Sequence, residues 1–168
     1  MNPVLCPVPR SVVPCGESFA APRRAAIVFA APLPPELDKA AQVQAAIMGR
    51  ICSVAISPDA PYRIELGLDE ALQGEAYSLD YGVERCLIRA STGAGFRNAF
   101  ATLAQLLLNG DAQPCVIGDA PVLAVRGFML DVSRNRVPAR RTLLHMVDLL
   151  WLLKYNQFQL YMEHTFAF

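Results

Sequence analysis

The last quarter of the chain shows the clearest change between apolar and polar stretches. Val125–Val132 is mostly apolar and predicts a strand, and Ser133–Asn135 interrupts that pattern. Arg140–Lys154 has the composition and length of a helix, and Pro138 stands where prolines favour a helix start. Asn156–Met162 predicts a second strand. A strand, a covering helix and a second strand with short connections form a β-α-β unit, which builds a parallel sheet.

The residues before this unit predict a smaller domain of strands and two helices. The expected elements are edge strands at Ser11–Val13 and Ser18–Ala20, a strand at Ala25–Ala31, a helix from Pro34 to about Gly49, strands at Ile51–Ile56 and Tyr62–Leu66, a hairpin of Glu75–Tyr81 and Val83–Ala90, and a helix from Thr92 to about Asn109. Thr92 can cap the second helix, and Gly110 can end it. The order predicts an α+β fold with a mostly antiparallel sheet and both helices on one face.

The boundary between the two parts is expected in a stretch rich in helix and strand breakers. Asp111–Pro121 contains Pro114, Gly118 and Pro121, and we interpret it as a linker. The sequence therefore predicts a small α+β domain over residues 1–122 and the β-α-β unit over residues 123–168.

The β-α-β unit resembles a known enzyme family. The run RGFMLDVSRNRVP, followed by a helix and KYNQFQLY, is similar to the first β/α repeat of the catalytic barrel in glycoside hydrolase family 20, which contains the β-N-acetylhexosaminidases. Upstream, EAYSLDYGVERCLIRASTGAGFRNAFATLAQLL is similar to the end of the small α/β domain that precedes that barrel. The resemblance covers about residues 7–168 and implies a small α+β domain followed by an incomplete (β/α)8 barrel fragment.

The resemblance also implies an activity that this chain does not contain by itself. Family 20 enzymes release terminal N-acetylhexosamine or related sugars by a substrate-assisted retaining mechanism, in which the acetamido oxygen attacks the anomeric carbon, an Asp orients it and an adjacent Glu is the general acid. This differs from the usual two-carboxylate scheme. The family's Asp-Glu pair lies on a later barrel strand, whereas Asp69-Glu70 falls in the small domain. Val125–Phe168 is also far shorter than the roughly 250 residues of a whole barrel. We therefore expect no catalytic residue in this chain and no activity of the chain alone.

Arg126 is the candidate substrate-binding residue. An arginine offers several fixed donors that can bind adjacent hydroxyls, and in the resembled family the matching arginine holds the terminal sugar. The alternative is a strand-end arginine paired with Asp131, Glu163 or another carboxylate. Arg126 and Asp131 lie an odd number of residues apart, so a regular strand directs them to opposite faces. We expect Asp131 and Arg134 to form a structural ion pair or loop clamp.

Glu163 and His164 are weaker substrate-binding candidates. They follow the second strand of the unit, where barrel enzymes usually place their chemistry. A Glu–His pair could act as acid and base, but two solvated residues at the rim of a substrate site explain the pattern equally well. The resembled family usually has histidines within this strand, whereas Gln159 and Tyr161 stand here. We therefore do not expect an unchanged hexosaminidase specificity.

Composition narrows the remaining partners. The 15 basic and 15 acidic residues give a net charge of 0, which argues against nucleic-acid binding. Five widely spaced cysteines without a C-x-x-C motif and only two histidines predict neither a metal site nor a cofactor. No apolar run approaches the ~18 residues of a membrane span. The start MNPVLCPVPR lacks a basic signal region, so we expect a cytoplasmic protein, or a secreted one if the gene begins further upstream.

Two other interpretations stay open at this point. One is a noncatalytic module for protein contact or weak carbohydrate binding. The other is an unrelated α/β protein whose end mimics the family, although the helix start Thr92-Gly93-Ala94-Gly95 lacks the third glycine and the lysine of phosphate loops. The open edge of the β-α-β unit also predicts self-association. The sugar, the linkage and the oligomeric state do not follow from the sequence.

Overall fold

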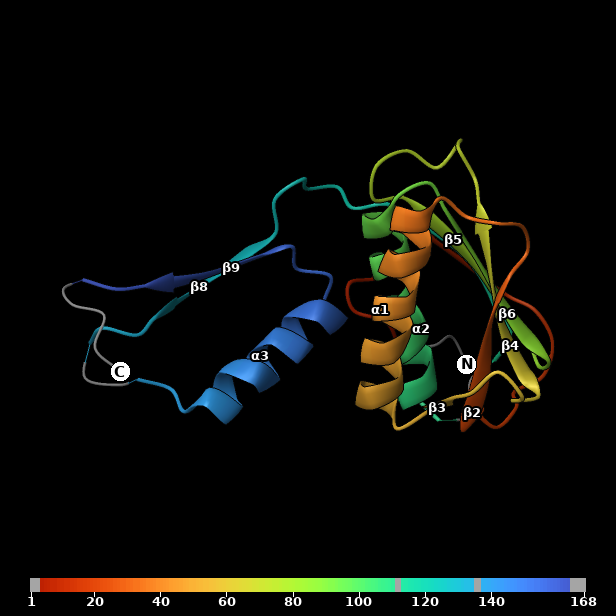
Figure 1. The fold of residues 1–168 in the computed structure, drawn as a ribbon, viewed down its shortest axis with the longest axis horizontal. Helices are drawn as coiled ribbons and strands as arrows, with labels where there is room; N and C mark the ends of the chain where they lie inside the picture. Colours follow the sequence, from red (N-terminus) through yellow and green to blue (C-terminus); the bar gives the residue numbers. More distant parts are fainter. Residues whose placement is uncertain (1–3, 111–112, 135–136, 164–168) are drawn as a thin grey trace. The chain divides into compact units, whose positions relative to one another are not determined.

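The computed structural model describes residues 4–110, 113–134 and 137–163 (Figure 1). The chain divides into two compact units, Met1–Pro121 and Val122–Phe168. This division falls one residue before the boundary expected from the sequence. Each unit has its own sheet, and the two are described in turn.

The first unit is built on a seven-stranded mixed sheet. Its strands are β1 (Ser11–Pro14), β2 (Arg24–Phe29), β3 (Ala55–Ile56), β4 (Tyr62–Leu68), β5 (Tyr77–Tyr81), β6 (Arg85–Ala90) and β7 (Cys115–Asp119). They stand in the order β1-β7-β5-β6-β4-β2-β3. The pairs of β2 with β3, β2 with β4 and β4 with β6 are parallel, and the other three are antiparallel. The prediction of a mostly antiparallel sheet is therefore wrong. Helix α1 (Pro35–Cys52) carries the chain back between β2 and β4, so these strands run in the same direction.

Helices α1 and α2 (Gly93–Leu108) lie side by side on one face of this sheet, as expected (Figure 1). The predicted cap of α2 is confirmed, because the Gly95 N–H donates to Thr92 Oγ1 at 3.0 Å. Gly110, with φ of 78°, follows the end of the helix in the left-handed region that glycine favours. The strands contribute the following buried side chains to the core: Tyr62, Ile64, Leu66, Tyr77, Leu79, Tyr81, Cys86, Ile88, Cys115 and Ile117.

Three predicted elements of the first unit are wrong. The expected edge strand Ser18–Ala20 is reduced to a single bridge residue, Phe19. The expected linker Asp111–Pro121 contains β7, which lies inside the sheet between β1 and β5. The expected strand Ile51–Ile56 is largely absent, because α1 continues to Cys52 and Ser53 turns the chain at φ of 55°. Only Ala55–Ile56 then pairs with β2. These segments are short, so their state depends on the strands beside them rather than on their own pattern.

The second unit has the predicted β-α-β order. It consists of β8 (Gly127–Asp131), α3 (Arg140–Leu152) and β9 (Gln157–Tyr161). The prediction that β8 and β9 are adjacent and parallel is confirmed, with Phe128 opposite Phe158 and their ring centroids 6.2 Å apart. Such a pair requires a crossover connection, which α3 supplies.

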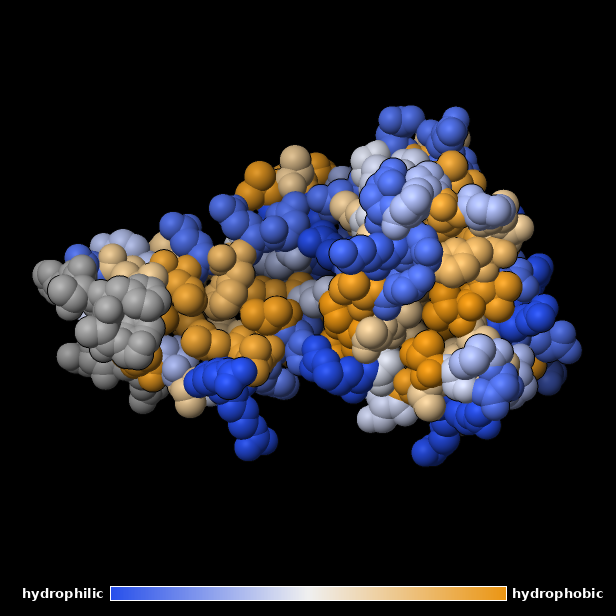
Figure 2. Space-filling model, viewed as in Figure 1, coloured by the Kyte–Doolittle hydropathy of each residue, from blue (hydrophilic) through white to orange (hydrophobic). Residues whose placement is uncertain are grey.

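Apolar side chains of the second unit are largely uncovered (Figure 2). Within the described residues of this unit, Trp151 and Val132 are the buried apolar side chains. The exposed large ones are Val122, Leu123, Val125, Phe128, Met129, Val137, Leu144, Val147, Leu149, Leu153, Leu160, Tyr161 and Met162. A helix and two strands with this much apolar surface require further elements to cover them.

Candidate functional site

Polar side chains gather at the carboxyl ends of β8 and β9. Arg134, in the loop after β8, places Nη2 2.5 Å from Glu163 Oε1 and Nε 3.6 Å from Asp131 Oδ2. The Tyr161 hydroxyl donates to Glu163 Oε1 at 3.1 Å. The Ser133 N–H and hydroxyl donate to Asp131 Oδ1 at 2.9 and 2.8 Å. These five residues form one connected group, which we name the carboxyl-end cluster.

The charges in this cluster stabilise one another. The hydrogen bonds from Ser133, and then the Arg134 charge, lower the pKa of Asp131. The hydrogen bond to Glu163 and the charge of Asp131 raise the pKa of Arg134. The hydrogen bond to Glu163 and its charge raise the pKa of Tyr161. Asp131 therefore stays ionised near neutral pH and can accept hydrogen bonds, but it is unsuited to act as a general acid.

Arg126 lies at the other end of the unit, before β8, and holds the connections together. Its Nε donates to Lys154 O at 2.8 Å and its Nη1 to Leu123 O at 2.6 Å. Its backbone N–H donates to Asn156 Oδ1 at 2.9 Å, and Asn156 Nδ2 donates to Ala124 O at 2.7 Å. The guanidinium thus joins the chain entering β8 to the turn that leads into β9.

The structure brings together some of the residues that the sequence singled out and separates another. Asp131, Arg134 and Glu163 share the carboxyl-end cluster, whereas Arg126 lies at the amino end of β8. His164 lies outside the described residues, so its proposed pairing with Glu163 stays a prediction. The sequence singled out Tyr161 only as a departure from the family's histidines and missed its contact with Glu163, although Tyr161 occupies the β9 position directly opposite Asp131. The strand alternation of β9 was the signal that could have found it.

The sequence also missed the role of Asn156. An asparagine between a helix and a strand is an ordinary turn residue, because its side chain can bond to nearby backbone groups. Here its side chain reaches back to residues about 30 positions earlier, which only the parallel pairing of β8 and β9 makes close.

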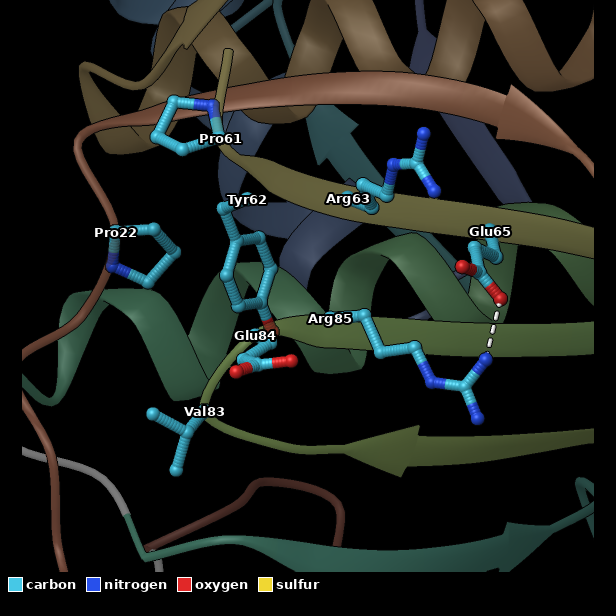
Figure 3. Close-up of a pocket in the computed structure, with 8 residues that line it drawn as sticks. All are labelled: Pro22, Pro61, Tyr62, Arg63, Glu65, Val83, Glu84 and Arg85. Atoms are coloured by element: carbon cyan, nitrogen blue, oxygen red, sulfur yellow. Dashed lines mark hydrogen bonds and ion pairs between the residues drawn. The ribbon is translucent and has the colours of Figure 1, made fainter.

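A pocket of about 740 Å³ opens around the beginnings of β4 and β6 in the first unit (Figure 3). Its lining residues are Pro22, Pro61, Tyr62, Arg63, Glu65, Val83, Glu84 and Arg85. Arg85 Nη1 and Glu65 Oε2 form an ion pair at 2.7 Å, while the Arg63 guanidinium stands apart from it (Figure 3). The Tyr62 hydroxyl donates to Gly82 O at 3.1 Å, and burial raises its pKa. The pocket carries charges of both signs, and the hydroxyl of its tyrosine is bonded to a backbone carbonyl.

Two further features are absent from the part of the chain that the structure describes. In these ranges no three His, Cys, Asp or Glu side chains lie close enough to hold a metal ion. Among the same residues, no helix is sufficiently long and apolar to cross a lipid bilayer.

Comparison with known proteins assigns the first unit to a family. Residues 2–120 match the family model of glycosyl hydrolase family 20, domain 2. The chain is 31% identical over 111 residues to β-hexosaminidase subunit A1 of Dictyostelium discoideum. The aligned region covers 62% of this chain and 20% of that protein. The chain is 36% identical over 99 residues to a β-hexosaminidase of Emericella nidulans. That aligned region covers 54% of this chain and 16% of the relative. The chain therefore spans a fifth or less of these relatives.

Solved structures share the fold across both units. A family 20 exo-β-N-acetylglucosaminidase of Vibrio harveyi, in complex with N-acetylglucosamine, superposes with a TM-score of 0.76 at 26% identity, over 95% of this chain and 25% of that one. A Streptomyces plicatus N-acetyl-β-hexosaminidase reaches 0.69 at 24% identity, over 94% of this chain and 34% of that one, which shows the fold alone. These matches exclude an unrelated α/β protein. Since the family model covers well over half of its residues, the chain belongs to glycoside hydrolase family 20.

Proposed function

We propose that this chain is the N-terminal part of a family 20 hydrolase that removes terminal N-acetylhexosamine or related sugars, with β8-α3-β9 as the beginning of its catalytic (β/α)8 barrel. The observation that carries the proposal is the parallel pairing of Phe128 with Phe158, directly after a family 20 domain 2. A parallel strand pair joined by a helix is the repeating unit of such a barrel. The likeness to the Vibrio harveyi structure covers 95% of this chain, beyond the residues 2–120 of the family model.

The exposed surface of the second unit supports the same proposal. Its apolar side chains, such as Phe128, Leu144 and Leu160, need cover that the described residues do not supply. In a complete barrel, neighbouring strands and helices would bury them. Without that cover, we expect the chain to self-associate through this surface, which analytical ultracentrifugation of the purified chain would show. A cytoplasmic location also stays a prediction, to be tested by cell fractionation.

The chemistry of the proposed enzyme depends on strands beyond this unit. By the family's substrate-assisted mechanism, the acetamido group of the sugar is the nucleophile, and an Asp-Glu pair on a later strand assists it. We therefore expect this chain alone to have no hydrolase activity. The carboxyl-end cluster lies at the edge of the strands where barrel enzymes bind substrate, so Glu163 is a candidate for the rim of the sugar site.

In this proposal Arg126 both stabilises the start of β8 and binds the sugar. Its hydrogen bonds to Lys154 O and Leu123 O orient the beginning of β8. In the resembled family the matching arginine holds the terminal sugar, and we propose the same contact for Arg126, whose guanidinium would exchange partners to make it. We expect the Arg126→Ala variant to bind the sugar less well and to loosen the start of the strand.

The test compares the chain alone with a chain whose barrel is completed by the later strands of a family 20 relative. Hydrolysis of 4-nitrophenyl N-acetyl-β-D-glucosaminide is the assay. We expect turnover only from the completed protein, and a fall in kcat/KM of about 100-fold, or roughly 3 kcal/mol, for Arg126→Ala. Arg141→Ala, an exposed arginine of α3, is the matched control and should leave kcat/KM unchanged. Comparable turnover by the chain alone, or an Arg126→Ala variant as active as its parent, would contradict the proposal.

A further inference from the structure

Strand β2 has an open edge. On one side it pairs with β4 over its length from Ala25 to Phe29, but on the other side β3 covers only Arg24 and Ala25. The chain leaves the edge after Ile56, the last residue of β3. Within the described ranges no other strand takes its place, so the second half of β2 has a neighbour on one side alone.

Backbone hydrogen bonds on the two sides of β2 identify the residues that face this edge. The Ala30 N–H donates to Leu66 O on the β4 side at 2.9 Å, whereas Ala25 O accepts a backbone N–H on the β3 side at 3.0 Å. Successive residues of a strand in a parallel ladder direct both backbone groups to alternate sides. The N–H and C=O groups of Ile27 and Phe29 therefore point to the open edge, in line with the ladder that β3 begins.

An apolar groove of about 540 Å³ lies beside the same two residues. It is formed by β2, α1 and the end of β3, with the lining residues Ile27, Phe29, Gln42, Ala45, Ala46, Ile56, Ser57 and Pro58. Hydrophobic residues gather over β2, next to α1, in the view of Figure 2. An unpaired strand edge and an aliphatic groove thus occur together, as in domains that bind a peptide by adding a strand to a sheet.

Charged residues stand near both ends of the groove. Gln42 Nε2, which lines the groove, donates to Oδ1 of the half-buried Asp38 at 2.7 Å. The exposed Lys39 follows Asp38 and lies seven residues before Ala46, on the same face of α1. At the opposite end Asp59 is paired with Arg24 at 3.1 Å. Because each end carries charges of both signs, the aliphatic lining rather than net charge selects the occupant.

We propose that the open edge of β2 and this groove bind an extended peptide segment, which adds a strand to the sheet in continuation of β3. Aliphatic side chains at alternate positions enter the groove between β2 and α1. Backbone hydrogen bonds to Ile27 and Phe29 set the register of the added strand, and the groove selects its side chains.

The test uses a fluorescein-labelled peptide of sequence Lys-Thr-Ile-Thr-Val-Thr-Thr and fluorescence anisotropy with the full chain. Ala46 is exposed and lines the groove, so Ala46→Arg blocks the groove without entering the core. Val43→Arg, an exposed position of α1 outside the lining, is the matched control. We expect the peptide to bind the parent and the Val43→Arg chain equally, and Ala46→Arg to weaken binding by about tenfold or more.

A second measurement separates strand addition from simple groove binding. Two further peptides carry N-methyl groups on alternate backbone nitrogens, one peptide in each of the two possible registers. Both keep their side chains, but only one loses the N–H donors that face β2. We expect binding to fall for that peptide alone. Amide hydrogen exchange at Ile27 and Phe29 should slow when the unmodified peptide binds. The proposal is overturned if the parent chain does not bind the peptide, if Ala46→Arg binds it equally, or if both methylated peptides bind unchanged. A dimer of the chain that Ala46→Arg dissociates, without peptide binding, would instead identify a second copy as the occupant.

Discussion

Two tyrosines of β5 allow a matched test of the core, since both are buried but only one has hydrogen-bond partners. The Tyr77 hydroxyl lies 2.5 Å from Thr102 Oγ1 on α2 and donates to Asp119 Oδ2 on β7 at 3.0 Å. The Tyr81 hydroxyl, two residues further along β5, is buried and has no hydrogen-bond partner among the described residues. Both side chains are 0% exposed, so replacing each by phenylalanine removes the same hydroxyl from a fully buried ring.

The expected effects differ in sign. Tyr77→Phe removes a hydrogen bond to a carboxylate and leaves the Thr102 hydroxyl, itself 1% exposed, without this partner. Together these losses should lower the free energy of unfolding by about 3 kcal/mol, since a hydrogen bond to a charged group is worth ~1.5–3 kcal/mol and a stranded buried hydroxyl costs ~1–3 kcal/mol. Tyr81→Phe removes a hydroxyl that loses its hydration on folding without gaining a hydrogen bond among the described residues. The variant should therefore be as stable as the parent or more stable by up to about 1 kcal/mol.

Urea denaturation followed by far-UV circular dichroism measures this difference. With an m-value of about 1.5 kcal/mol/M, the two midpoints should lie roughly 2 M apart while m stays the same. The double variant Tyr77→Phe/Thr102→Val should recover part of the loss, because it also removes the stranded hydroxyl. Equal midpoints for Tyr77→Phe and Tyr81→Phe would refute the reasoning, and with it the assignment of β7 to this position in the sheet.

Three further outcomes are expected. A Cβ on Gly95 would meet Ala76 O at 2.7 Å, so Gly95→Ala should lose about 2 kcal/mol despite its better helix propensity, and an unchanged melting temperature would contradict this. Burial raises the pKa of the Cys52 thiol from 9.0 to about 11. Its contribution to stability is therefore complete below pH 9 and lost between pH 9 and 11, and Cys52→Ala should reduce that pH dependence in urea titrations. Asn156→Ala removes two hydrogen bonds to the backbone and should destabilise the second unit by about 1–2 kcal/mol. The fluorescence emission of Trp151, the single tryptophan, reports the unfolding of this unit. A lower unfolding midpoint seen by circular dichroism alone, with the tryptophan midpoint unchanged, would argue against this assignment.

Local patterns predicted the elements whose signals lie within one stretch of chain. The Thr92 cap, the helix that it begins and the hairpin of β5 and β6 follow from neighbouring residues. The parallel pairing of β8 and β9 also follows, because an intervening helix and short connections leave few alternatives for two apolar strands. For these parts, local propensity and tertiary structure agree.

The candidate site shows where sequence reasoning ends. Asp131 and Arg134 are close in sequence, so their proximity could be expected. The contacts of Arg134 with Glu163 and of Asn156 with Ala124 join residues about 30 positions apart, and they exist because β8 and β9 are paired. No spacing rule along the chain indicates such contacts.

What the sequence alone determined is the β-α-β order of the last quarter, the capped helix before it and, through their residues, the likeness to family 20. Only the tertiary structure decided that Cys115–Asp119 is a strand within the sheet, that the sheet is mixed and that β2 keeps an open edge beside a groove. The physical reason is that a short strand gains its hydrogen bonds and burial from its neighbours, which can lie a hundred residues away along the chain.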